Sequence, residues 1–157
     1  MHIRVQGILH DLSKYSLTEL SICKYYNGSK SPHEQAREIL GYSPSWIHHK
    51  HKNKHHWQYW VDDNEAGNLI GIKIPYKYIV EMFCDMVGAS KTYLKDTFTY
   101  QSPLNYYLTK CRGKQIIHEK SASLLYTFLK FYAEFNNEKI FLRWYNVHRA
   151  DLKYVYN

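Results

Sequence analysis

The stretch "GILHDLSKYS" at residues 7–16 places a histidine directly before an aspartate, with an apolar pair ahead of them and a lysine three residues behind. On its own, the His10-Asp11 pair fits either the polar end of a helix or one corner of a metal site. The choice between the two depends on whether distant segments of the chain supply further ligands.

The composition predicts one globular domain spanning residues 1–157, long enough to bury a core without disulfide bonds. Aromatic residues make up 17% of the chain, with 16 tyrosines, which suit a core of rings with hydrogen-bonded hydroxyls and could also stack on bases. The formal net charge of +7 favours anionic partners. Nucleic acid, nucleotides and other phosphorylated molecules all qualify, and charge alone does not choose among them.

The three cysteines, Cys23, Cys84 and Cys111, are far apart and form no CxxC pair. This pattern argues against a disulfide framework and for a reducing compartment. The N-terminus has no apolar run after its basic residues, and no apolar stretch approaches the length needed to span a bilayer. We therefore expect a cytoplasmic protein without a membrane partner; the sequence does not predict its oligomeric state.

Helix-start and helix-stop signals recur along the chain. Ser16 and Glu19 form a capping-box pattern for a helix that should end near Asn27-Gly28. "SPHEQAREILGY" repeats the signal, with Ser31 as N-cap and Gly41 as the stop. Further helix starts are predicted at Ser43, Pro75, Ser102 and His118.

Residues 62–74 are the exception, because 62–67 look like a turn and 69–74 alternate like a short strand. The C-terminal residues 139–157 fit either a helix or a strand. The predicted fold class is mainly α, with one small irregular or β excursion near 62–74.

A second informative stretch is "WIHHKHKNKHHWQYW" at residues 46–60, which holds five histidines. The interleaved lysines suit a solvated basic segment, but the tryptophans that bracket the run indicate that part of it faces a core. His49 and His56 are seven residues apart, which is roughly 10 Å along one straight helix, too far for one ion with bonds near 2 Å. Either the helix breaks near Asn53, or the two histidines serve different ions.

The third candidate is Asp85, within "EMFCDMVGAS" at residues 81–90. A carboxylate among apolar residues needs a partner or a metal if it is buried. Glu81 lies one turn earlier and could share its face. Together with His10-Asp11 and the histidine run, Asp85 completes a nitrogen and oxygen ligand set that suits one or two ions of Mn, Fe, Ni or Zn.

These three blocks resemble the HD superfamily of metal-dependent phosphohydrolases, all-helical proteins named for an adjacent His-Asp pair. More closely, they resemble an uncharacterised bacterial and phage domain family, over most of residues 7–110. The resemblance implies an HD-like helical bundle with metal ligands at its centre. By this resemblance the metal ligands would be His10, Asp11, His49, His55, His56 and Asp85, and Lys14 would contact a phosphate.

Two departures from the HD pattern stand out. HD enzymes usually contribute a further histidine from a helix before the pair, and here the sole candidate is His2, about 12 Å away along one helix. Gln58 stands where an acidic residue is expected after the histidine pair. A missing ligand has three alternative consequences: an open coordination position, a substituted ligand or a lost activity.

Two classes of function remain open from the sequence. The first is a phosphohydrolase acting on a nucleotide or other phosphoester, with Asp11 and Lys14 as catalytic residues. Substrate binding would fall to Lys14, Lys50, Lys54 and Lys91. The second is a nucleotide- or nucleic-acid-binding module that retains a metal site without turnover. In either case we expect His49 and at least one of His55 and His56 to point inward, and His51 to be solvated.

Overall fold

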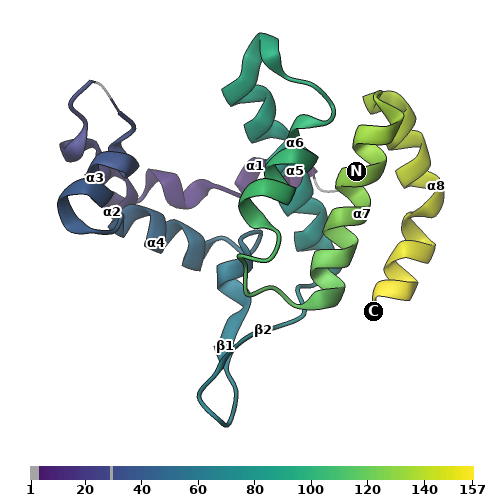
Figure 1. Cartoon of the computed structure of the whole chain (residues 1–157), viewed down its shortest axis with the longest axis horizontal. Coiled ribbons are helices and arrows are strands. Elements are labelled where there is room, and N and C mark those ends of the chain that lie inside the picture. Colours follow the sequence, from purple (N-terminus) through teal and green to yellow (C-terminus); the bar gives the residue numbers. More distant parts are fainter. Residues whose placement is uncertain (1–3, 29) are drawn as a thin grey trace.

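The computed structural model describes residues 4–28 and 30–157. The fold is mainly α-helical, with a single two-stranded antiparallel sheet in the described part of the chain. This confirms the predicted mainly α class with a small β excursion. Figure 1 shows a bundle of long helices beside a narrower arm of short helices. None of the described helices is both long and apolar enough to cross a membrane.

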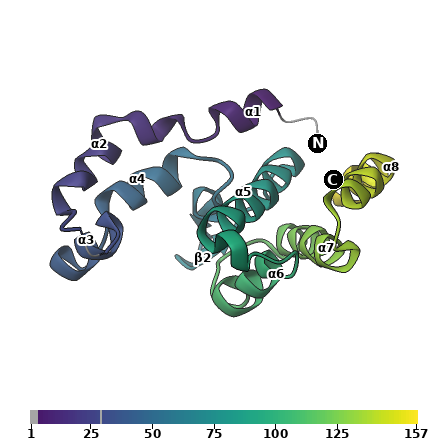
Figure 2. The same ribbon diagram turned by 90° about the horizontal axis from the view of Figure 1, so that it is seen from above.

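The arm consists of the described residues up to 56, and its segments run back and forth in two layers, as Figure 2 shows. The segments are α1 (Arg4–Leu9), the 3₁₀ turn Leu12–Tyr15, α2 (Leu17–Leu20), the 3₁₀ turn Ser21–Tyr25, α3 (Pro32–Leu40) and α4 (Pro44–Lys52). α2 packs against α4, which brings the His10-Asp11 region alongside the histidine run.

Local capping explains the helix ends in the arm. Ser31 and Glu34 form a complete capping box at the start of α3, and Gly41 ends that helix in the left-handed conformation at φ 78°. The expected single helix from Ser16 to Gly28 was wrong, because α2 ends at Leu20 and continues as a 3₁₀ turn. The Ser21 hydroxyl donates to the Thr18 carbonyl at 2.8 Å, and such bonds compete with helix geometry.

A hairpin connects the arm to the bundle. A 3₁₀ turn at Trp57–Trp60 leads into β1 (Val61–Asp63), which pairs with β2 (Leu69–Gly71). The strand predicted over 69–74 is therefore shorter than expected. Gly71 lies so close to residues 116–118 that a Cβ atom would meet the His118 backbone nitrogen at 2.5 Å.

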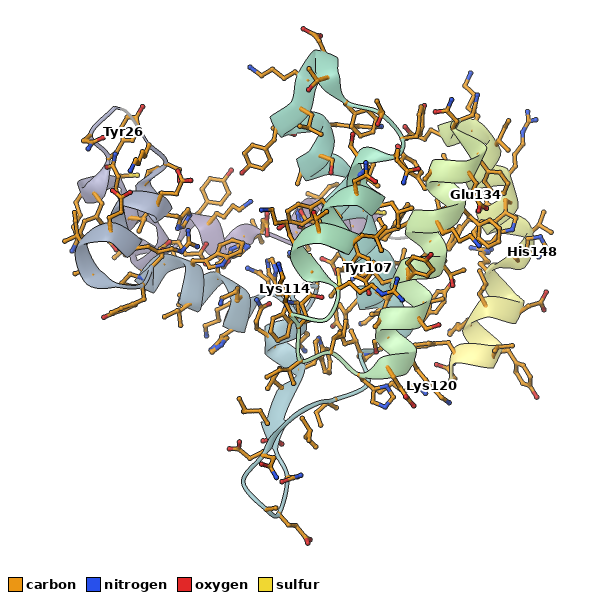
Figure 3. The ribbon with its side chains drawn as sticks, viewed as in Figure 1. Tyr26, Tyr107, Lys114, Lys120, Glu134 and His148 are labelled. Atoms are coloured by element: carbon orange, nitrogen blue, oxygen red, sulfur yellow. The ribbon has the colours of Figure 1, made fainter. Side chains whose placement is uncertain are left out.

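The bundle holds the hydrophobic core. Its segments are α5 (Tyr76–Leu94), the 3₁₀ turn Lys95–Thr97, α6 (Ser102–Tyr106), the π-helical turn Tyr107–Cys111, α7 (Glu119–Phe135) and α8 (Glu138–Tyr156). Tyr107 is buried and contacts the Tyr126 ring on α7, whereas His148 lies on the outer side of α8, at the opposite end of the molecule from Tyr26 (Figure 3). The C-terminal segment, whose sequence fits either a helix or a strand, forms the helix α8.

A buried group of hydrogen bonds ties the two ends of the bundle together. The Ile74 amide donates to the Ser121 hydroxyl oxygen at 3.0 Å, and the Ser121 and Tyr156 hydroxyls are 2.8 Å apart. The Tyr156 hydroxyl also donates to the Ile74 carbonyl. These bonds fix the last turn of α8 against the starts of α5 and α7.

We predict opposite stability effects at two glycines. Gly71→Ala should lower the free energy of unfolding by roughly 1–3 kcal/mol, because its methyl group would overlap rigid backbone at residues 117 and 118. Gly88→Ala, in α5 with no atom within 4 Å of its added methyl group, should instead raise it by about 0.5–1 kcal/mol. Urea unfolding of both variants measures the difference, and a Gly71→Ala variant as stable as wild type would contradict the close packing.

Candidate metal centre

The end of α1 positions the His-Asp pair. The helix ends at Leu9, and Asp11 lies at the start of the following 3₁₀ turn, where its carbonyl accepts from the Lys14 amide at 2.9 Å. The His10 ring folds back, so that its Nδ1 lies 2.6 Å from the Gly7 carbonyl oxygen. Because a carbonyl only accepts, Nδ1 is the protonated nitrogen and Nε2 of the neutral ring carries a lone pair.

The two carboxylate oxygens of Asp11 face different sets of histidines. Oδ2 is 3.3 Å from His10 Nε2 and pairs with the Lys14 ammonium. Oδ1 is 3.4 Å from His49 Nε2 and 3.7 Å from His55 Nε2. Oδ1 is buried and has no hydrogen-bond partner among the described residues. Asp11 therefore lies between two groups of potential ligands.

The first cluster consists of His10, Asp11 and Asp85, whose ligand atoms all lie within 4.8 Å of one another. Asp85 comes from the middle of α5, and its Oδ1 is 3.8 Å from His10 Nε2. The predicted convergence of these three residues, which are far apart in the sequence, is confirmed. The alternative in which Asp85 points outward from α5 is excluded.

The second cluster consists of His49, His55 and His56, again with ligand atoms within 4.8 Å of one another. α4 ends at Lys52 with Asn53 as its C-cap, so the chain turns there and brings the histidine pair back beside His49. Of the two alternatives left open by the spacing of His49 and His56, the helix break near Asn53 is the one observed. The Nε2 atoms of His55 and His56 are buried without a hydrogen-bond partner in the described structure.

Buried carboxylates on the outer side of the centre orient the rings. Glu19 accepts from Nδ1 of both His48 and His49, each at 2.9 Å, and Glu81 lies 3.4 Å from Nδ1 of His55. Such carboxylate–histidine pairs are typical of metal centres, because they fix the tautomer and aim the other ring nitrogen inward. Here they leave the Nε2 lone pairs of His49 and His55 facing Asp11.

The sequence did not predict that Glu19 and Glu81 orient the histidine rings. Glu19 was interpreted only as part of a capping box, and its backbone amide does bond to Ser16. Glu81 was considered only as a neighbour of Asp85 on α5. Its position one turn before Asp85 was a signal for Glu81, whereas no local signal marks Glu19, since its histidine partners are about 30 residues away.

The electrostatics keep the ligand atoms in forms that bind metals. Burial alone would raise the pKa of Asp11, but the Lys14 ammonium and the neighbouring His10 and His49 outweigh it and hold that pKa below its ordinary value. Burial, reinforced by His55 and His49, lowers the pKa of His56 to about 3. Asp11 is therefore ionised and His56 is neutral at physiological pH.

The four predicted substrate-binding lysines have different surroundings. Lys14 contacts Asp11, and its side chain is 59% exposed, so its ammonium is both at the centre and open to solvent. Lys50 is half-buried on α4, and the Lys54 ammonium lies over the rings of Tyr59 and Tyr78. Lys91 pairs with Glu138 of α8 at 2.6 Å. Among the four, Lys14 is the one with a described ion pair to a cluster residue, and Lys50 contributes to the lowered pKa of His56.

The remaining predictions for individual residues have mixed outcomes. His51 is exposed, as expected, while His49 and His55 are buried. Gln58 is half-buried, and its Oε1 has no hydrogen-bond partner in the described part of the chain. His2, the sole candidate for an upstream histidine, lies outside the described residues.

The fold and the site define a mainly α-helical protein with a candidate histidine–carboxylate metal centre between an arm and a bundle. The chain belongs to a family of unknown function (DUF5662), whose model matches residues 1–131. That match includes every residue of both clusters and their outer carboxylates, and it leaves out α8. No curated protein and no solved structure matches the chain.

We predict that the outer carboxylate Glu19 is structurally essential and that an exposed glutamate is not. Glu19→Ala should lower the free energy of unfolding by about 1–3 kcal/mol, because it leaves two histidine Nδ1 groups without their acceptor. Glu38→Ala removes the same charge from an exposed pair with Lys30 and should cost less than about 1 kcal/mol. Equal losses of stability in urea unfolding would show that the Glu19 contacts carry no special energy.

Proposed function

We propose that the protein is an HD-like phosphohydrolase that uses two divalent ions to hydrolyse a nucleotide or another phosphoester. The observation that carries the proposal is the approach of Asp11 Oδ1 to the Nε2 atoms of His49 and His55, at 3.4 and 3.7 Å. All three atoms carry lone pairs in the tautomers that the outer contacts favour. Lone pairs that face one another in a buried position repel, and a cation between them removes the repulsion.

The distances and donor types support metal binding at both clusters. Ligand atoms around one ion with bonds near 2 Å lie roughly 3–4 Å apart, and the contacts of Asp11 with His10, His49 and His55 fall at 3.3–3.7 Å. Imidazole and carboxylate ligands without thiolate favour Mn, Fe, Ni or Zn. Because each oxygen of Asp11 faces a different cluster, Asp11 would bridge the two ions.

The chain's own groups fit the chemistry of phosphoester hydrolysis. Bound divalent ions supply an activated water and neutralise charge on the phosphoryl oxygens. Asp11 would hold the ions at a fixed separation, while Glu19 and Glu81 would keep the histidine rings in place. Lys14, whose pKa is raised by Asp11 and Asp85 against the opposing effect of burial, stays cationic and would stabilise negative charge developing on a phosphoryl oxygen.

The order of the ligands supports the HD-like part of the proposal. The adjacent pair His10-Asp11 precedes a histidine group, and the distal Asp85 follows on a later helix, as the resemblance implies. The histidines after the pair, His49 and His55-His56, would supply the ligands that an upstream histidine provides in other HD enzymes. The net charge of +7 supports an anionic substrate.

A nucleotide-binding module without turnover is the second candidate. Two tyrosines favour it: Tyr15, the residue after Lys14, has 79% of its surface exposed, and Tyr93, one of the groups that raise the pKa of Lys14, is 84% exposed. Exposed aromatic rings beside a cation suit stacking on a base and pairing with its phosphate. Hydrolysis assays of metal-loaded protein separate this candidate from the enzyme.

We predict that loss of Asp11 removes both ions, whereas loss of a ligand from one cluster removes one ion. Wild-type protein dialysed against Mn²⁺ or Zn²⁺ should hold two ions per chain by mass spectrometry of the metal. His10→Ala and His56→Ala should each hold one ion, and Asp11→Ala should hold neither, because it removes a ligand of both. His51→Ala, at an exposed histidine outside both clusters, is the control and should keep two. Full metal content in Asp11→Ala would refute the bridging role.

We predict that Lys14 acts in turnover and not in metal binding. Lys14→Ala should keep its metal yet lose about 10²-fold or more in kcat on a nucleoside monophosphate or bis-(4-nitrophenyl) phosphate, as for loss of one transition-state contact. Lys52→Ala, an exposed lysine on α4, is the matched control and should keep wild-type activity. If wild-type protein with full metal content hydrolyses no nucleotide or phosphodiester of a panel, the result would favour the binding module.

A further inference from the structure

A pocket lies between α5 and α8. Its volume is about 420 Å³, which falls within the range typical of small-molecule sites. The first turns of α5 line it with Tyr76, Lys77 and Val80, and α8 contributes Tyr145, Arg149 and Lys153. In Figure 1, α8 forms the edge of the bundle opposite the arm.

The lining combines an apolar floor with a cationic rim. Val80 and Tyr145 are almost completely buried, at 1% and 4% exposed, and close the bottom of the pocket, while the half-buried Tyr76 offers its ring to the pocket. The Tyr76 hydroxyl is buried near that of Tyr145, but the two do not meet in hydrogen-bond geometry. An aromatic or aliphatic group of a ligand would fit this floor.

The charges of the rim have no acidic counterpart. Lys77, Arg149 and Lys153 form no ion pair with a carboxylate in the described part of the chain. Arg149 and Lys153 are four residues apart on α8 and therefore share a face, whereas Asp151 between them points elsewhere. Arg149 lines the same pocket as Tyr76 and Tyr145, which places its charge beside the floor.

The pocket and the candidate metal centre use different residues of α5: Val80 lines the pocket, whereas the next residue, Glu81, contacts His55. Asp85 lies nine residues after Tyr76 on α5, roughly 13 Å along the helix axis. The family match ends at residue 131, so the cationic half of the pocket comes from a helix outside the matched region. A function of this pocket therefore need not be shared by the whole family.

We infer that this pocket binds a small organic anion. Its aromatic or aliphatic body would lie on Val80 and the two tyrosine rings, and its carboxylate, phosphate or sulfonate head would contact Arg149, Lys153 and Lys77. The three cations, without carboxylates to neutralise them, favour an anion over a neutral ligand of the same shape. The inference is independent of the proposed hydrolysis at the metal centre.

A pair of fluorescent probes tests the charge requirement in the full-length protein. 1-Anilinonaphthalene-8-sulfonate carries the anionic head, and N-phenyl-1-naphthylamine is its neutral counterpart. Arg149→Gln combined with Lys153→Gln should weaken binding of the sulfonate about tenfold, the effect of two partly exposed charges, and leave the neutral probe unchanged. Lys139→Gln combined with Arg143→Gln removes two exposed cations elsewhere on α8 and is the control, with sulfonate affinity within about twofold of wild type.

A filling substitution tests the location. Ala150→Trp adds a large side chain at a pocket-lining position that is exposed on α8, and circular dichroism and urea unfolding verify that the fold is kept. It should abolish binding of both probes, and EDTA treatment of wild-type protein should leave sulfonate affinity unchanged. Equal sulfonate affinity in the two double variants, or strong sulfonate binding by folded Ala150→Trp, would overturn the inference.

Discussion

The carboxylate of Asp11 is the contact on which the candidate metal centre depends. Its two oxygens reach histidines from three segments, and Lys14 balances its charge on the solvent side. The unsatisfied lone pairs around Oδ1 are unfavourable in a chain without cations, so the same contact that organises the centre also supports the proposed binding of an ion. Asp11 is therefore central both to the geometry of the site and to its proposed chemistry.

The arm has little apolar material of its own to hold it in place. Ile22 and Ala36 are its buried hydrophobic residues among those described, whereas the bundle buries an extended core around Phe83, Phe128 and Phe141. What the arm buries instead is mainly polar: Glu19, Gln35, Ser43, Ser45, His49, Asn53 and His55. Because hydrogen-bonded polar contacts contribute less net stability than apolar burial, metal binding and the positioning of the arm should be thermodynamically linked.

The two candidate sites lie in different parts of the molecule. The candidate metal centre lies where the arm meets α5, inside the region that the family model matches. The α5–α8 pocket lies at the other side of the bundle and draws its positive charge from α8, outside that region. α5 contributes to both, with Asp85 at its middle, Tyr76 at its start, and the adjacent residues Val80 and Glu81 in its second turn. A rigid helix of this length holds the two sites at a fixed distance.

The sequence by itself determined several helix boundaries, such as both ends of α3, and the candidate ligands, because these depend on local chemistry. Ser31, Gly41 and Pro75 act through capping and backbone restriction within a few residues, and the predicted break at Asn53 followed from the length of a helical turn. Only the tertiary structure decided that Glu19 and Glu81 orient the histidines, that residues 138–156 form a helix and that α8 completes a pocket. These features arise from contacts between segments distant in the chain, and neither hydrophobic periodicity nor capping carries information about such contacts.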